Sequence, residues 1–117
     1  MILKNQDKGI NREKLGGSGK GHALGYPINI PDQNGAFIMT TRLDLEPGTS
    51  VSYHTHVDNE EVYFVMKGNG TYTEENETIP VKAGDIMLCR MGHSHGIENT
   101  GTETMILGAA IAKRNKD

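Results

Sequence analysis

The sequence predicts an all-β protein, an antiparallel barrel of about eight short strands. Short runs rich in β-branched and apolar residues alternate with turn signals, at spacings of roughly 8 to 12 residues. Glycine accounts for 15 of the 117 residues, about twice its usual share, as expected for a chain with many tight turns. No stretch keeps a helical period between recognisable caps. A chain of this length is expected to form one domain around one core.

Eight segments after residue 35 have the length and composition of strands. The strongest is 61–67 (EVYFVMK), which is closed by the turn residues Gly68-Asn69-Gly70. The first, 36–45, ends at another turn signal, Glu46-Pro47-Gly48. The remaining predicted strands are 51–56, 71–73, 77–81, 86–89, 95–99 and about 103–112.

Residues 1–35 are polar and rich in glycine, and the run GGSGKG lies at 16–21. A phosphate-binding loop would need Ser or Thr after the lysine, but Gly21 follows Lys20. We therefore expect 1–35 to be an N-terminal arm, flexible over its first part, that packs on the barrel or on a partner. Residues 36–117 are expected to form the barrel.

Charge and hydropathy argue against several kinds of partner. The formal net charge of −3 and a pI of about 5.9 do not favour nucleic acid. No apolar run approaches the roughly 18 residues that suggest a membrane span. Met1 to Leu3 are followed by polar residues rather than by an apolar signal segment, so a cytoplasmic protein is expected. The single cysteine, Cys89, excludes an internal disulfide and is expected to be buried.

Four of the five histidines form two His-x-His pairs, His54 with His56 and His93 with His95. Alternate residues of a strand point to the same side of the sheet, so both imidazoles of such a pair can face the barrel interior. Two imidazoles on one face can converge on a single ion at bond lengths of about 2 Å. The pattern therefore indicates a metal site.

A carboxylate from the next strand would complete this site, and Glu60 and Glu61 are the candidates. Strand alternation groups Glu61 with Tyr63 and Val65 on one face and leaves Glu60 on the other. Tyr63 is expected to pack in the core or to line the pocket.

Two segments resemble the sequence signature of the cupin family. The first family motif, GxxxxxHxHxxxxExxxxxxG, is matched at every fixed position between Gly48 and Gly68. The second, GxxxxxPxGxxHxxxN, is matched between Gly84 and Asn99, except that Arg90 stands where the family has proline. The resemblance implies a double-stranded β-helix, also called a jelly-roll barrel.

The same resemblance implies one divalent metal ion per chain, held by His54, His56, Glu61 and His95. Mn, Fe, Ni, Co and Zn all suit such a mixture of imidazole and carboxylate ligands. His93 lies off the motif and is expected near the entrance of the site.

The motifs leave the reaction open, because one fold hosts many chemistries. The chain resembles single-domain cupins that look like oxalate decarboxylase. One hypothesis is a metal-dependent enzyme (a decarboxylase, dioxygenase, isomerase or lyase) that acts on a small oxygenated anion or polyol. Its candidates for acid–base chemistry are Tyr63, His93 and Glu60, and Arg90 would help to capture an anion.

The other hypothesis is a barrel that binds or senses a small molecule without catalysis. In either case we expect a homodimer, because exposed sheet edges are usually covered or paired.

Overall fold

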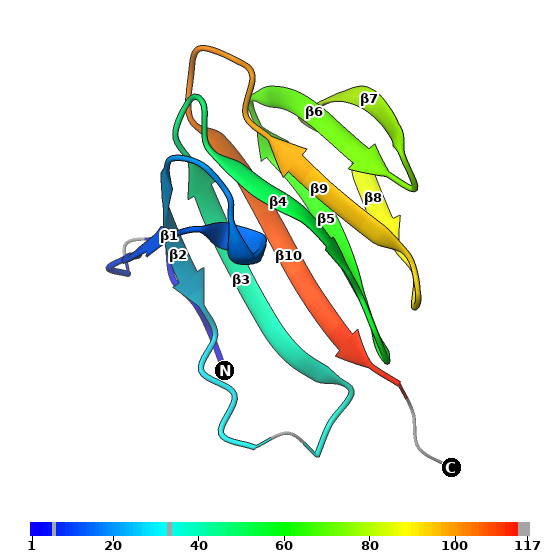
Figure 1. Cartoon of the computed structure of the whole chain (residues 1–117). Helices are drawn as coiled ribbons and strands as arrows, with labels where there is room; N and C mark the ends of the chain where they lie inside the picture. Colours follow the sequence, from blue (N-terminus) through cyan, green and yellow to red (C-terminus); the bar gives the residue numbers. More distant parts are fainter. Residues whose placement is uncertain (6, 33, 115–117) are drawn as a thin grey trace.

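The computed structural model describes residues 1–5, 7–32 and 34–114, which form ten strands in two antiparallel sheets. The six-stranded sheet has the order β1-β2-β3-β10-β5-β8, and the four-stranded sheet has the order β4-β9-β6-β7. Figure 1 shows the two sheets facing each other as a double-stranded β-helix, which confirms the predicted all-β fold. The strands are β1 (Ile10–Glu13), β2 (His22–Pro27), β3 (Phe37–Leu45), β4 (Ser50–Thr55), β5 (Asn59–Lys67), β6 (Asn69–Glu74), β7 (Glu77–Lys82), β8 (Ile86–Cys89), β9 (Ser94–Glu98) and β10 (Met105–Lys113).

The eight strands expected after residue 35 are all present, with bounds within about three residues of the predicted ones. The segment before residue 36, expected to be an arm packed on the barrel or on a partner, contains two strands that the sequence did not predict. It contributes β1 and β2, which extend the six-stranded sheet by pairing β1 with β2 and β2 with β3. These strands have few β-branched residues, so their sequences do not indicate strands.

The glycine-rich run between β1 and β2 forms a tight turn against β4. It includes the short 3-10 helix η1 (Leu15–Gly17). Among the described residues, no helix has the length and hydropathy of a membrane span. The backbone N–H of Lys20 donates to the hydroxyl of Ser50, and the carbonyl of Lys20 accepts from the Ser50 N–H. Glycine is required here because a Cβ at Gly16, where φ is +74°, would lie 2.6 Å from the Ser52 carbonyl oxygen.

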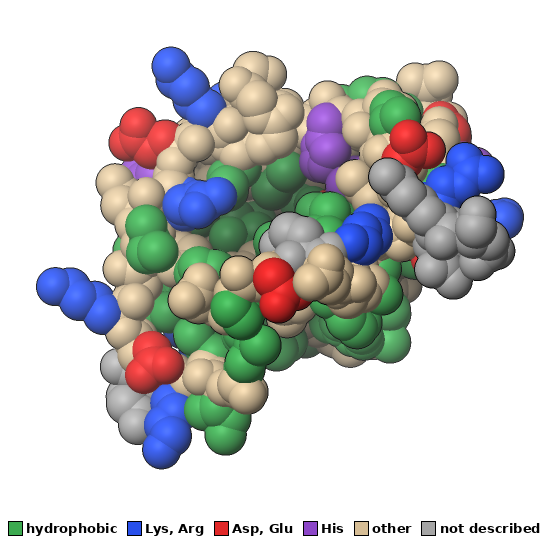
Figure 2. Space-filling view, turned by 90° about the horizontal axis from the view of Figure 1, so that it is seen from below, with side chains coloured by type: hydrophobic (Ala, Val, Ile, Leu, Met, Phe, Trp, Pro, Cys, Tyr) green, Lys and Arg blue, Asp and Glu red, His purple; other side chains and the backbone are tan. Residues whose placement is uncertain are grey.

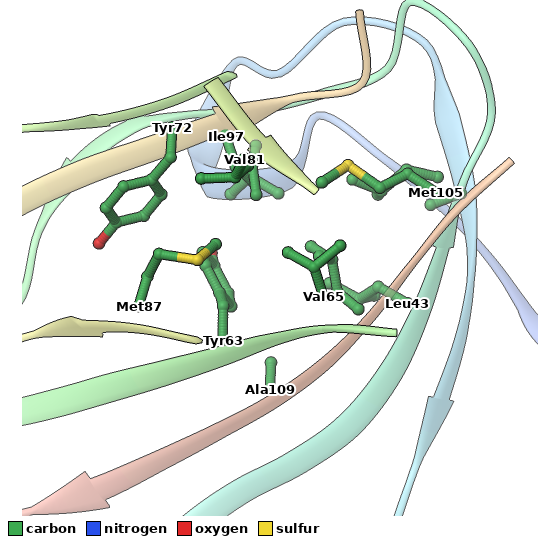
Figure 3. Packing of buried hydrophobic residues seen from close by; sticks show 13 residues of the cluster. Leu43, Tyr63, Val65, Tyr72, Val81, Met87, Ile97, Met105 and Ala109 are labelled. Atoms are coloured by element: carbon green, nitrogen blue, oxygen red, sulfur yellow. The ribbon is translucent and has the colours of Figure 1, made fainter. Parts of the chain in front are cut away.

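The core lies between the two sheets. Figure 3 shows Tyr72, Val81 and Ile97 of the four-stranded sheet pointing toward side chains of the six-stranded sheet. Alternation along the strands supplies this layer, since inward residues are buried while their neighbours are exposed. The buried apolar cluster consists of Ala23, Leu43, Leu45, Val51, Tyr63, Val65, Tyr72, Val81, Met87, Ile97, Met105, Leu107 and Ala109.

Candidate metal centre

Three strands bring four possible metal ligands together inside the sandwich. His54 lies on β4 and His56 directly after it, Glu61 lies on β5, and His95 lies on β9. Their ligand atoms all lie within 4.8 Å of one another, and we call these four residues the ligand cluster. Glu61 is contributed by the six-stranded sheet, whereas the three histidines come from the four-stranded sheet and the loop that follows β4.

A bulge in β4 sets the direction of its two histidines. The pairing of β4 with β9 shifts between Val51 and His54, so that His54 lies directly opposite His95. An extra residue in one strand changes the side to which the following side chains point. Val51 and His56 are consequently both buried, although strict alternation would place them on opposite faces.

The ligand atoms form a compact group. The Nε2 atom of His56 lies 3.1 Å from that of His54, 3.0 Å from that of His95 and 3.1 Å from Oε1 of Glu61. His95 Nε2 is 3.0 Å from the same Glu61 oxygen, whereas His54 Nε2 is 3.9 Å from it. His56 therefore neighbours all three other ligands, and His54 and Glu61 form the widest of these pairs.

These separations fit the ligands of a single ion. Two ligands at about 2.1 Å from an ion lie about 3.0 Å apart at a right angle, but about 3.4 Å apart at a tetrahedral angle. Four of the five separations given above are 3.0 or 3.1 Å, close to the value for a right angle. The four side chains are thus close enough together to bind one ion.

Hydrogen bonds at the far side of two rings fix their tautomers. His54 Nδ1 lies 2.7 Å from the carbonyl oxygen of Ser52, and His56 Nδ1 lies 2.6 Å from Oδ1 of Asn59. Both oxygens can only accept, so each Nδ1 carries the hydrogen and each Nε2 of the neutral ring has a free lone pair. Such partners are typical of imidazoles that bind metals.

The third ring is fixed by a tyrosine. His95 Nδ1 lies 2.9 Å from the hydroxyl oxygen of Tyr72, and that hydroxyl donates to Oε1 of Glu74 at 3.0 Å. The Tyr72 oxygen is then the acceptor for the Nδ1 hydrogen of His95, which again leaves Nε2 free. Burial and the bond to Glu74 raise the pKa of Tyr72, so this hydroxyl keeps its hydrogen.

The electrostatics of the cluster also suit a cation. Burial alone would raise the pKa of the Glu61 carboxyl, but interactions with His54 and His95 lower it to about 2. Glu61 is thus ionised at neutral pH. The Glu61 carboxylate raises the pKa of His54, whereas burial lowers the pKa of His95, which is fully buried.

Tyr63 packs against the cluster as part of its wall. Its ring stacks on the His95 imidazole with centroids 4.9 Å apart and planes 7° from parallel. Burial, together with the charge of Glu61, raises the pKa of Tyr63 well above the ordinary range. Cys89, opposite Glu61 on β8, is buried as expected, and burial raises the pKa of its thiol to about 11.

The cluster opens into a cavity of about 290 Å³. Figure 2 shows a hollow with apolar walls, with a histidine side chain at its rim and Lys or Arg side chains nearby. Most lining side chains are apolar, and the polar ones include Arg12 and Thr41 beside three members of the ligand cluster. The lining residues are Arg12, Leu15, Gly16, Gly25, Pro27, Met39, Thr41, Leu43, Val51, His54, His56, Glu61, Tyr63 and Ile111.

The other residues singled out from the sequence lie elsewhere. Glu60 lies outside the ligand cluster. The Nδ1 atom of His93 is 3.4 Å from Glu75 Oε1, away from the cluster's ligand atoms. Arg90 is exposed and is not among the residues that line the cavity. Arg12 lines the cavity instead, and sequence reasoning missed it because the composition of its segment does not indicate a strand that joins the sheet.

Known proteins resemble this chain in both sequence and structure. The family model "Cupin domain" matches residues 41–111. The oxalate-binding protein of Thermotoga maritima is 39% identical over 73 residues, which are 62% of this chain and 60% of that protein. Germin-like protein 1 of Brassica napus is 34% identical over 66% of this chain and 40% of its own length. The chain therefore spans less than two thirds of either relative.

Two crystal structures extend the comparison. A predicted oxalate decarboxylase from Thermotoga maritima superposes with a TM-score of 0.89 and 28% identity, over 97% of this chain and 99% of that one. A putative sugar phosphate isomerase from Acidithiobacillus ferrooxidans has a TM-score of 0.74 and 25% identity, over 96% and 74% of the two chains. The double-stranded β-helix and the match over residues 41–111 lead to one conclusion: the chain belongs to the cupin family.

Proposed function

We propose that this chain binds one divalent transition-metal ion through the ligand cluster and, at that ion, a small oxygenated anion. The observation that carries the proposal is the direction of the three imidazoles. Each Nδ1 is hydrogen-bonded to an acceptor, so three Nε2 lone pairs and a carboxylate face one point. Four lone pairs so close together repel one another unless a cation lies between them.

The spacing of the ligand atoms favours a six-coordinate ion. Mn, Fe, Co and Ni accept this arrangement of imidazole and carboxylate, whereas zinc with protein ligands is usually tetrahedral. Four protein ligands leave two positions of an octahedron for a small molecule. When bound, the ion would hold and polarise oxygen atoms of that molecule.

The size of the cavity and the relatives support the choice of ligand. A cavity of about 290 Å³ lies at the lower end of the range for small-molecule pockets. One relative is called an oxalate-binding protein, and one structural neighbour is called a predicted oxalate decarboxylase. We therefore propose a small dicarboxylate such as oxalate, which can supply two oxygens to one ion.

Catalysis at the same ion is the second candidate, favoured by the two positions left for a reactant. The acid–base candidates give it little support. His93 lies beside Glu75, and Tyr63 is stacked on His95 with a strongly raised pKa. Decarboxylation of hydrogen oxalate would break its C–C bond and give formate and carbon dioxide. Formate appearing in the NMR spectrum of metal-loaded protein with oxalate would establish an enzyme.

Metal analysis of single alanine variants tests the ion site. Wild type purified with Mn, Fe, Co or Ni available should hold about one ion per chain. The four variants of the ligand cluster should lose it, since each removes a ligand atom. Glu60→Ala is the matched control, because it removes a carboxylate one residue away on the same strand.

Two results would count against this assignment. If Glu60→Ala loses the ion and Glu61→Ala keeps it, the carboxylate ligand is wrong. If wild type takes up no divalent metal at neutral pH, the proposed function is wrong as a whole.

A further inference from the structure

We infer that Arg12, on β1, binds the oxygens of the ligand that are turned away from the ion, and so selects dianions over monoanions. This inference rests on the proposed function, because it concerns the anion bound at the metal centre. Arg12 is the cationic side chain, apart from the histidines, among the described residues that line the cavity.

The pairing of the first strands explains why Arg12 points to the cavity. Arg12 is paired with Ala23 of β2, and Ala23 is paired with Leu45 of β3. Ala23 and Leu45 are 1% and 0% exposed, so this row of side chains faces the interior. The next pair along the strands, Asn11 and Leu24, faces the opposite side of the sheet and is exposed. Arg12 itself is exposed, because β1 is the edge strand of the sheet, and its side chain lines the cavity from that edge.

A glycine makes room for the stem of this arginine. Gly25 also lines the cavity, and a Cβ at this position would lie 3.1 Å from Cγ and 3.7 Å from Cδ of Arg12. The stem thus lies along the wall of the cavity over a position without a side chain. Any larger residue at position 25 would push the stem away from this wall.

The guanidinium of Arg12 is available to a ligand. Among the described residues, Arg42 is paired with Asp44 and Arg114 with Asp58, but no carboxylate lies within ion-pair distance of Arg12. A guanidinium donates two parallel hydrogen bonds to a carboxylate, an arrangement that an ammonium group cannot reproduce.

The charge balance of the cavity favours a dianion. Glu61 supplies the one carboxylate among the described lining residues, and it is ionised at neutral pH. A divalent ion and the Arg12 guanidinium together outweigh this carboxylate by two positive charges. A dicarboxylate would neutralise them, whereas a monocarboxylate would leave one positive charge unbalanced in a partly enclosed site.

Calorimetric titration of metal-loaded protein with oxalate and with glycolate tests this role. Glycolate also offers two oxygens to an ion but carries one negative charge. Arg12→Gln, which keeps most of the stem, should retain the metal and bind oxalate about ten- to a hundredfold more weakly. Its affinity for glycolate should change much less, by about threefold or less. The oxalate affinity of Arg12→Lys should lie between those of wild type and Arg12→Gln. Lysine keeps the positive charge but cannot donate two parallel hydrogen bonds to one carboxylate.

Arg90→Gln is the matched control, since Arg90 is an exposed arginine outside the cavity. It should leave both affinities unchanged. If Arg12→Gln binds oxalate as tightly as wild type, or if its affinities for oxalate and glycolate fall equally, Arg12 does not select dianions. Either result would leave the proposed metal site unaffected. If metal-loaded wild type binds neither anion, the proposed anion site and this role of Arg12 are both wrong.

Discussion

At the scale of single residues, each imidazole of the ligand cluster is oriented by a partner from a different part of the fold. The partners are the Ser52 carbonyl on β4, the Asn59 side chain on β5 and the Tyr72 hydroxyl on β6. Each tautomer is therefore fixed before any ion arrives. Binding then costs little reorganisation of the rings, which is the advantage of a prearranged site.

We predict that metal affinity falls as the pH is lowered, and that the fall begins above pH 6.5. A proton on Nε2 blocks the lone pair that an ion needs, so protonation of any ring competes with binding. The Glu61 carboxylate raises the pKa of His54, so this ring takes up a proton first as the pH falls. Burial lowers the pKa of His95, so that ring is protonated later.

Titration of metal-free protein with Mn at a series of pH values between about 5 and 8 would measure this dependence. An affinity that stays constant down to pH 5 would contradict the prediction.

At the scale of elements, the turn between β1 and β2 depends on glycine. Gly16 has a positive φ and lies against the Ser52 carbonyl. We predict that Gly16→Ala lowers the free energy of unfolding by about 1–2 kcal/mol from the left-handed backbone alone, and by more if β4 must move. Urea denaturation would measure the change.

Gly35→Ala is the matched control for this prediction. Gly35 is exposed, has no atom within 4 Å of an added Cβ, and is not in the left-handed region. Alanine there should be neutral or stabilise the protein by up to about 1 kcal/mol. Equal effects of the two substitutions would mean that the turn tolerates a side chain.

Turn residues and alternation made most of the elements predictable. Most turns between the strands from 37 onward contain glycine, and alternation along 61–67 correctly grouped Glu61 with Tyr63 and Val65 as buried residues. β1 and β2 were missed because INRE and HALGYP hold few strand-forming residues, and long-range pairing with β3 stabilises them. The sequence pointed to Arg90 as the cation near the site, whereas Arg12 lines the cavity. Arg12 was missed for the same reason as β1, since local sequence does not reveal which distant strands pair.

At the scale of the whole molecule, the outer face of the six-stranded sheet carries an apolar patch. On β5 and β8, Phe64, Met66, Ile86 and Leu88 are 44%, 52%, 64% and 50% exposed. Phe64 is paired directly with Ile86, so these two side chains are neighbours on that face. Water-exposed apolar clusters of this kind often mark an interface.

We predict a homodimer in which this patch is covered by a second copy. Phe64→Glu should shift the protein toward a monomer, because burying an unpaired carboxylate opposes association. Light scattering after size exclusion, at micromolar concentration, would measure the mass. Ile79→Glu on β7, a residue exposed to 48% on the other sheet, is the matched control and should stay dimeric. A monomeric wild type would contradict the prediction.

The ligand cluster joins the two sheets, because Glu61 belongs to one and His95 to the other. An ion bound there would act as a cross-link between the layers of the sandwich. The buried apolar cluster holds the layers together over the rest of their length. Without the ion, the repulsion among the lone pairs would be relieved most easily by local separation of the layers around these ligands. Local opening of the sandwich would then begin at the end that carries the ligand cluster. Occupancy of the metal site would therefore control the rigidity of the mouth of the cavity.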